Sequence, residues 1–337
     1  MKKILLMLLM AASTTVFAQT QDAATLHETA KAFIRQGDYE NAILVLNRAI
    51  QQEPQNLEMT KDLLFSYYLK RDFTKALEIG KPLVERTDAD VPSYHMMGLV
   101  YKAIADNKEA EKLYKKAMKL FPNEGILYSE YGEMILEKDA ENALKLFEKG
   151  IELAPNHSSN YFFVSREYAK RGEILWSMLY AETFLNMESY TPRATELKNL
   201  LLDQYKKFFV AGNASAAYNP KKVNDFTKAV AEVLSQQQTQ AGYGITPESL
   251  TIIRTRFVLD WYEKYGTKFP FRLFEHQRQL LEEGLFEAYN FWLFGPAASL
   301  QTYQTWSQFH KQELDAYLAF ARSKIYKVPE GQQYRVF

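Results

Sequence analysis

The sequence predicts an all-α protein in which a solenoid of stacked helical hairpins is followed by a further helical region. The main observation is an alanine that recurs at a nearly constant interval of 34, 34 and 33 positions, at Ala42, Ala76, Ala110 and Ala143. A short turn sequence precedes each alanine, and a proline or another turn residue closes each unit. Repeats of this period are typical of helical arrays, because one hairpin cannot bury its apolar face alone.

The composition is that of an ordinary soluble protein. Of the 337 residues, 47% are hydrophobic and 24% are charged, and the 41 basic residues balance the 41 acidic ones. A nucleic-acid binder concentrates cations, so this balance argues against nucleic acid as a partner. Because cysteine is absent, disulfides, thiolate metal sites and cysteine nucleophiles are excluded.

The first 18 residues have the pattern of a secretory signal peptide. Lys2 and Lys3 precede an apolar run over residues 4–12, and Val16 and Ala18 supply small residues at the two positions that signal peptidase reads. The alternative is an uncleaved anchor, but the run is shorter than the roughly 20 residues that span a bilayer. We therefore expect residues 1–18 to be removed on export, most simply to a bacterial periplasm, without stable membrane insertion afterwards.

Small and large residues alternate within each repeat as hairpin packing requires. A small residue early in the first helix lets the second helix approach, and four hairpins supply one: Ala30, Gly98, Gly132 and Ser165. Larger side chains fill the gap between hairpins: Phe33, Tyr67, Tyr101 and Ile135. The second repeat departs from this pattern, with Leu64 at the small position and with Gly80 and Pro82 in its second helix. Because proline cannot donate a helix hydrogen bond, we expect a kink or a helix end there.

The stretch from Gly37 through Ala42 to Pro54 closely resembles the tetratricopeptide repeat (TPR), as do residues 94–122. The resemblance covers four repeats over residues 23–157. A divergent fifth repeat at 158–191 and an amphipathic capping helix at 193–209 extend the predicted solenoid to residues 23–209. The resemblance implies a right-handed superhelix whose first helices line a concave groove, and a non-enzymatic role in binding a protein or peptide.

The resemblance also places the second, fifth, ninth and twelfth residues of each repeat in that groove. Nine of these are our candidate partner-binding residues: Lys31, Lys61, Phe65, Tyr68, His95, Leu99, Lys102, Phe162 and Arg166. Relatives that bind a terminal carboxylate use a polar clamp, but Phe65 and Leu99 occupy clamp positions here, so that ligand is not implied. The alternative for any single candidate is a solvated surface side chain.

Residues 210–245 are predicted to form a linker and one helix, at about 223–238, and residues 246–337 an aromatic-rich helical region. We expect three helices in this region, from Thr246 to Gly266, at 271–294 and at 299–326. The stretch from Tyr243 to Phe337 contains 21 aromatic residues. In one interpretation the rings form the core of a cap. In the other, a glycan-binding or glycan-processing module uses Trp261, Trp292 and Trp306 for stacking.

No motif points to catalysis, a metal or a cofactor. The five histidines are scattered, without the close spacing of metal ligands. The sequence lacks a nucleophile elbow, a phosphate-binding loop and a dinucleotide fingerprint. We therefore predict no catalytic residue, no metal and no cofactor, while an enzyme built from distant residues stays open. The oligomeric state is not indicated by the sequence.

Overall fold

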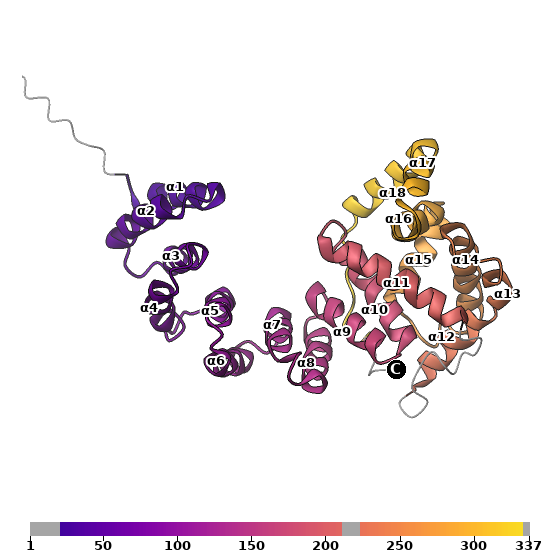
Figure 1. Ribbon diagram of the computed structural model, residues 1–337, viewed down its shortest axis with the longest axis horizontal. Helices are drawn as coiled ribbons and strands as arrows, with labels where there is room; N and C mark the ends of the chain where they lie inside the picture. Colours follow the sequence, from indigo (N-terminus) through magenta and orange to yellow (C-terminus); the bar gives the residue numbers. More distant parts are fainter. Residues whose placement is uncertain (1–20, 211–222, 333–337) are drawn as a thin grey trace, which may run out of the picture. The chain divides into compact units, whose positions relative to one another are not determined.

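The computed structural model describes residues 21–210 and 223–332, and over these residues it contains 18 helices and no strand (Figure 1). The all-helical repeat fold is thereby confirmed. The predicted signal peptide, residues 211–222 of the predicted linker and the last five residues lie outside the described residues. Within the described ranges, no helix combines the length and the apolar character needed to cross a bilayer. The chain divides into two compact units, Met1–Ala105 and Asp106–Phe337.

The first unit holds two complete hairpins and the first helix of a third. Its helices are α1 (Ala23–Gln36), α2 (Tyr39–Gln52), α3 (Leu57–Leu69), α4 (Phe73–Leu83) and α5 (Val91–Ala103). An Asp or Asn side chain caps the start of every one by accepting a backbone N–H: Asp22, Asp38, Asn56, Asp72 and Asp90. Such caps satisfy amide donors that have no partner within the helix.

In the second repeat, the small size of Gly80 makes room for the large side chain of Leu64. Leu64 is fully buried at the position where the other repeats have a small residue. Gly80 lies opposite, where an added methyl group would come within 2.5 Å of the sulfur of Met97 and 3.3 Å of Leu64. The helix α4 ends at Leu83, one residue after Pro82. The departure of this repeat from the usual pattern is therefore accommodated by a glycine and a shorter helix.

The second unit continues the hairpins and then adds the C-terminal helices. Its repeat helices are α6 (Asn107–Leu120), α7 (Gly125–Ile135), α8 (Ala140–Leu153), α9 (Ser158–Lys170), α10 (Ile174–Met187) and α11 (Pro192–Val210). The small positions behave as the sequence predicts: Ala110, Ala143 and Ser165 are fully buried. A methyl group on Gly132 would overlap the ring of Phe147, which shows how closely α7 and α8 approach.

The C-terminal helices are shorter and more numerous than the sequence predicts. They are α12 (Asp225–Ser235), α13 (Gln238–Ala241), α14 (Pro247–Lys264), α15 (Arg272–Glu282), α16 (Phe286–Ala298), α17 (Leu300–Phe309) and α18 (Lys311–Ser323). The single helix expected at 271–294 is broken at Gly284, whose φ of 70° is left-handed. The helix expected at 299–326 is broken at His310, and Pro296 lies inside α16 instead of ending it.

One hydrophobic core joins the last repeats to the C-terminal helices. It extends from Ala143 in α8 to Phe320 in α18, and the stretch of α10 from Ile174 to Leu185 is buried on all sides. The helix α10 contacts α9, α11, α12 and α15. The second unit is therefore built around α10, with the repeats and the aromatic-rich helices packed on the same core.

A buried ion pair holds this core together. Arg254 of α14 pairs with Glu182 of α10, and both side chains are almost completely buried. The same Glu182 oxygen accepts hydrogen bonds from Gln277 Nε2 and Tyr289 Oη, each at 2.8 Å, and Arg254 donates to Asn290. The network thus connects α10, α14, α15 and α16.

Candidate functional site

Seven of the predicted binding residues lie on the first helices of the first unit. Lys31 is on α1, Lys61, Phe65 and Tyr68 are on α3, and His95, Leu99 and Lys102 are on α5. Their spacings of three, four and seven residues place them on one side of each helix. Consecutive first helices contact one another, α1 with α3 and α3 with α5. We call the surface formed by these seven residues the first-helix face.

An aromatic pair lies at the middle of the first-helix face. The rings of Phe65 and Tyr68 stack with centroids 6.1 Å apart and planes 15° apart, and Tyr68 also contacts Phe73, at 6.2 Å. Both side chains of the pair are partly exposed, as is Leu99 on the neighbouring α5. Partly exposed aromatic rings in a fixed arrangement are the kind of residue that dominates protein–protein binding energies.

Two lysines of this face, Lys61 and Lys31, are paired within the unit. Lys61 is only 4% exposed, and its ammonium bonds Asp90 at 2.5 Å and Glu58 at 2.6 Å. Burial alone would lower the pKa of Lys61, but the hydrogen bonds to these two carboxylates outweigh burial and raise it. Lys31 bonds Glu28 at 2.9 Å. Lys61 therefore links α3 to the start of α5, and its charge is not available to a partner.

The remaining two candidates lie on α9 in the second unit. Arg166 lines a groove of about 500 Å³ between α9 and α11, where its Nε bonds Glu196 at 2.8 Å. Phe162 is 5% exposed, and the guanidinium groups of Arg166 and Arg193 lie over its ring. Gln204 of α11, which also lines the groove, is buried, and its Oε1 has no hydrogen-bond partner among the described residues.

The three candidate tryptophans do not share an exposed groove. Trp261 is fully buried against the rings of Phe257 and Phe274, and Trp292 is 6% exposed against Tyr289 and Tyr317. Trp306 is partly exposed, but its ring stacks on Phe291 at 4.0 Å. The rings of Trp261 and Trp292 have no open face for a sugar and contribute to the core instead.

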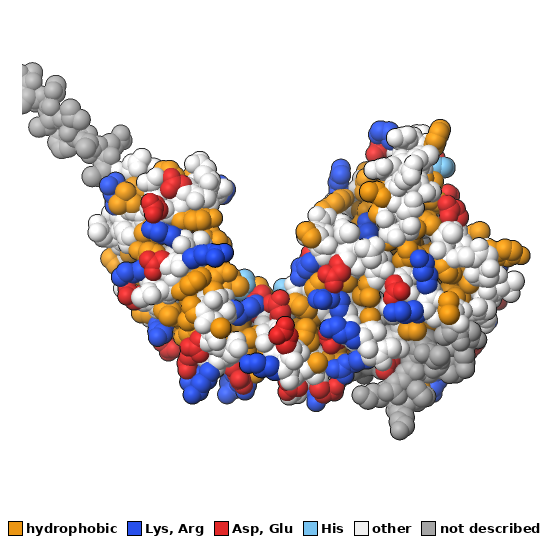
Figure 2. Space-filling view, in the orientation of Figure 1, with side chains coloured by type: hydrophobic (Ala, Val, Ile, Leu, Met, Phe, Trp, Pro, Cys, Tyr) orange, Lys and Arg blue, Asp and Glu red, His pale blue; other side chains and the backbone are white. Residues whose placement is uncertain are grey.

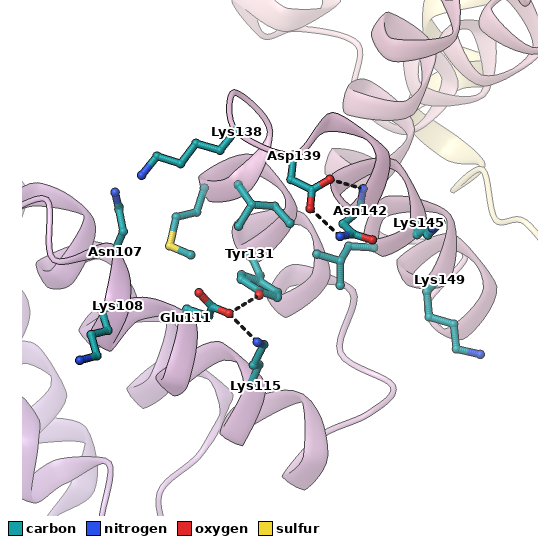
Figure 3. A pocket seen from close by; sticks show the side chains of 13 residues that line it. Asn107, Lys108, Glu111, Lys115, Tyr131, Lys138, Asp139, Asn142, Lys145 and Lys149 are labelled. Atoms are coloured by element: carbon teal, nitrogen blue, oxygen red, sulfur yellow. Dashed lines mark hydrogen bonds and ion pairs between the residues drawn. The ribbon is translucent and has the colours of Figure 1, made fainter.

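A larger groove, which is not among the sites that the sequence predicts, lies among the repeat helices of the second unit. It has a volume of about 900 Å³, and residues of α6, α7, the α7–α8 turn and α8 line it (Figure 3). Five of its lining residues are lysines: Lys108, Lys115, Lys138, Lys145 and Lys149. The family resemblance places binding residues on first helices, whereas this groove lies between the second helices α6 and α8, and we call it the second-helix groove. In the sequence, only the seven-residue spacing of Lys108 and Lys115 indicates that two of its lysines lie on one side of a helix.

Over the described residues, no group of three His, Asp or Glu side chains is arranged to hold a metal ion. Basic and acidic side chains are interspersed on the visible face of the repeats (Figure 2). The arrangement offers surfaces and grooves for another molecule.

Comparison with known proteins places part of the chain among tetratricopeptide repeats. Two family models described as tetratricopeptide repeat match residues 33–98 and 91–124. A TPR repeat-containing protein of Methanocaldococcus jannaschii is 21% identical in an alignment of 240 positions that covers 66% of this chain and 41% of the relative. The aligned part thus spans about two fifths of the length of that relative.

Solved structures of repeat proteins are also similar. A thermophilic TPR protein of Thermus thermophilus is 18% identical, with a TM-score of 0.43, and the match covers 55% of this chain and 99% of that one. A tetratricopeptide repeat protein of Parabacteroides merdae is 14% identical, with a TM-score of 0.42, and the match covers 75% of this chain and 96% of that one.

Proposed function

Because this chain is an all-helical protein of tetratricopeptide repeats, a class that generally mediates protein–protein interactions, we propose that it is a non-enzymatic adaptor for a protein or peptide. The proposed contact surface is the first-helix face. The observation that carries the proposal is the partly exposed, stacked pair of Phe65 and Tyr68, with Leu99 on the next first helix.

The first-helix face is held in a fixed arrangement before any partner binds. Lys61 of α3 bonds Asp90, and Asp90 also caps the start of α5 by accepting the N–H of Ser93 at 3.0 Å. The imidazole of His27 on α1 contacts Asp62 on α3 at 2.7 Å. These two links set the spacing of the three first helices. Because a preorganised surface loses less conformational entropy on association, this arrangement supports the proposed role.

Site-specific photocrosslinking tests which surface contacts the partner. A photoreactive phenylalanine analogue at Tyr68 is expected to give discrete crosslinked products in cells. The matched control is the same analogue at Leu44, which is 51% exposed on the second helix α2. Products from position 68 but not from position 44 support the proposal, whereas equal products from both positions contradict this site.

We also propose that the protein is exported to a bacterial periplasm. The basic pair Lys2–Lys3, the apolar run at residues 4–12 and Ala18 support export, and the absence of cysteine is compatible with an oxidising compartment. The test is fractionation of the producing cells followed by N-terminal sequencing. A periplasmic chain that begins at Gln19 is expected, and a cytoplasmic chain that retains residues 1–18 would contradict export.

A further inference from the structure

We propose that the second-helix groove is a separate docking site for an acidic, amphipathic helix of a partner protein. The groove is lined by residues 107–149 and shares no residue with the first-helix face. It therefore adds a second binding site to the proposed adaptor, and the chemistry of its lining indicates what it binds.

The floor of the groove is apolar and adaptable. Met134 and Ile135 of α7 and Leu146 of α8 are partly exposed in it, beside the ring of Tyr131. The Tyr131 hydroxyl donates to Glu111 at 3.2 Å, which fixes the ring (Figure 3). A flexible methionine beside rigid apolar neighbours can fit partner side chains of different shapes. At about 900 Å³ the groove has room for several such side chains.

The edges of the groove carry an excess of positive charge. Five lysines line it against two carboxylates, Glu111 and Asp139. Both carboxylates are engaged within the unit. Lys115 bonds Glu111 and lowers the pKa of that carboxyl group, and Asp139 caps α8 by accepting the N–H of Asn142 at 3.1 Å.

Three of the lysines have no counter-ion among the residues that the structure describes. Lys108, Lys138 and Lys145 are exposed, and none of them forms an ion pair with another residue in the described part of the chain. Because the whole chain is electrically neutral, this local excess is a property of the groove and not of the composition. A partner with negative charges would complement it, and charge complementarity of this kind steers association.

The arrangement of the lysines favours a helix as the occupant. Lys108 and Lys115 lie on α6, and Lys145 and Lys149 lie on α8, on either side of the apolar floor. Lys108 and Lys115 are two turns apart, a rise of about 10 Å. Lys145 and Lys149 are about one turn apart. A helix with an apolar stripe, carboxylates two turns apart on one flank and carboxylates one turn apart on the other matches this spacing, and helix-in-groove docking uses such a stripe. The lining contains no arginine for bidentate phosphate contacts, which disfavours nucleic acid.

The test uses a labelled model peptide, designed as an amphipathic helix with a leucine stripe flanked by glutamates. The control peptide has lysine in place of every glutamate. We expect fluorescence anisotropy to show binding of the glutamate peptide alone, weakening as salt is raised. The triple variant Lys108→Glu/Lys138→Glu/Lys145→Glu should lose at least about tenfold in affinity, from unfavourable charge contacts. The matched control Lys206→Glu/Lys268→Glu/Lys327→Glu makes the same charge change at exposed lysines outside the groove.

The outcomes are distinct. No binding of the glutamate peptide, or equal losses in both triple variants, would overturn the proposal. Tighter binding of a single-stranded oligonucleotide that is lost in the groove variant would also overturn it, in favour of nucleic acid. Substitution of Phe65 and Tyr68 should leave peptide binding unchanged. The proposal for the groove can therefore fail while the proposed function of the first-helix face stands, and the reverse. Circular dichroism of every variant confirms the fold.

Discussion

At the scale of single residues, Lys198 is the most unusual cation in the structure. Its Nζ donates to the backbone oxygen of Trp292 at 2.8 Å and lies 3.7 Å from the centroid of that ring. Among the described residues no carboxylate pairs with it. Burial lowers the pKa of Lys198 to about 7. The folded protein therefore releases this proton at a pH at which the unfolded chain still holds it.

This difference predicts that folding stability depends on pH between about 7 and 10.5. In that range the unfolded state binds one more proton than the folded state, so stability rises with pH. Below pH 7 both states are protonated, and the folded state bears the full penalty of a buried charge. Lys198→Met removes the penalty, and its urea midpoint is expected to exceed that of the wild type at pH 7 and to converge with it by about pH 10.5. If the two urea midpoints differed by the same amount at every pH in this range, Lys198 would not lose its proton in the folded state near pH 7.

At the scale of helices, the buried ion pair of Glu182 and Arg254 connects α10 to the C-terminal helix α14. Removing one partner of a buried ion pair leaves an uncompensated charge, which costs about 3–5 kcal/mol, whereas replacing both partners by apolar residues is often neutral. We predict that Arg254→Met lowers the stability by about this amount. The double variant Arg254→Met/Glu182→Leu should recover most of the loss. Thermal denaturation of the three proteins checks this, and a double variant no better than the single one would argue against the pair.

The contact of α7 with α8 gives a second prediction at this scale. A methyl group on Gly132 would overlap the ring of Phe147, which itself stacks on Phe163 at 4.8 Å. Gly132→Ala should therefore destabilise the protein by about 1–3 kcal/mol through overpacking, despite the higher helix propensity of alanine. Adding Phe147→Leu should restore part of the loss in urea denaturation. Stabilisation by Gly132→Ala would mean that the two helices are less closely packed.

At the scale of the whole molecule, the sequence predicts the repeats better than it predicts the region after them. Ala42, Ala76 and Ala110 recur every 34 positions, and full burial of all three follows from that period. The C-terminal helices have no period. The apolar pattern runs through the breaks at Gly284 and His310, so that this pattern alone predicts longer helices.

The candidate site was predictable only in part, for similar reasons. Repeat position alone brings Phe65 and Tyr68 onto one face, but the burial of Lys61 depends on Asp90, a carboxylate from the next repeat. The lysines of the second-helix groove come from two second helices and a turn, and no single segment shows their clustering. The pairing of Glu182 with Arg254 joins residues 72 positions apart and leaves no local trace in the sequence.

Binding of a protein partner to the first-helix face can be measured by titration calorimetry with the partner that is identified by crosslinking from Tyr68. We predict that Phe65→Ala/Tyr68→Ala weakens binding at least about tenfold, because truncating central aromatic residues costs more than about 1 kcal/mol each. Leu44→Ala, on an exposed second helix, should bind as tightly as the wild type. Equal affinities for all three proteins, with the fold of each confirmed by circular dichroism, would contradict the claim.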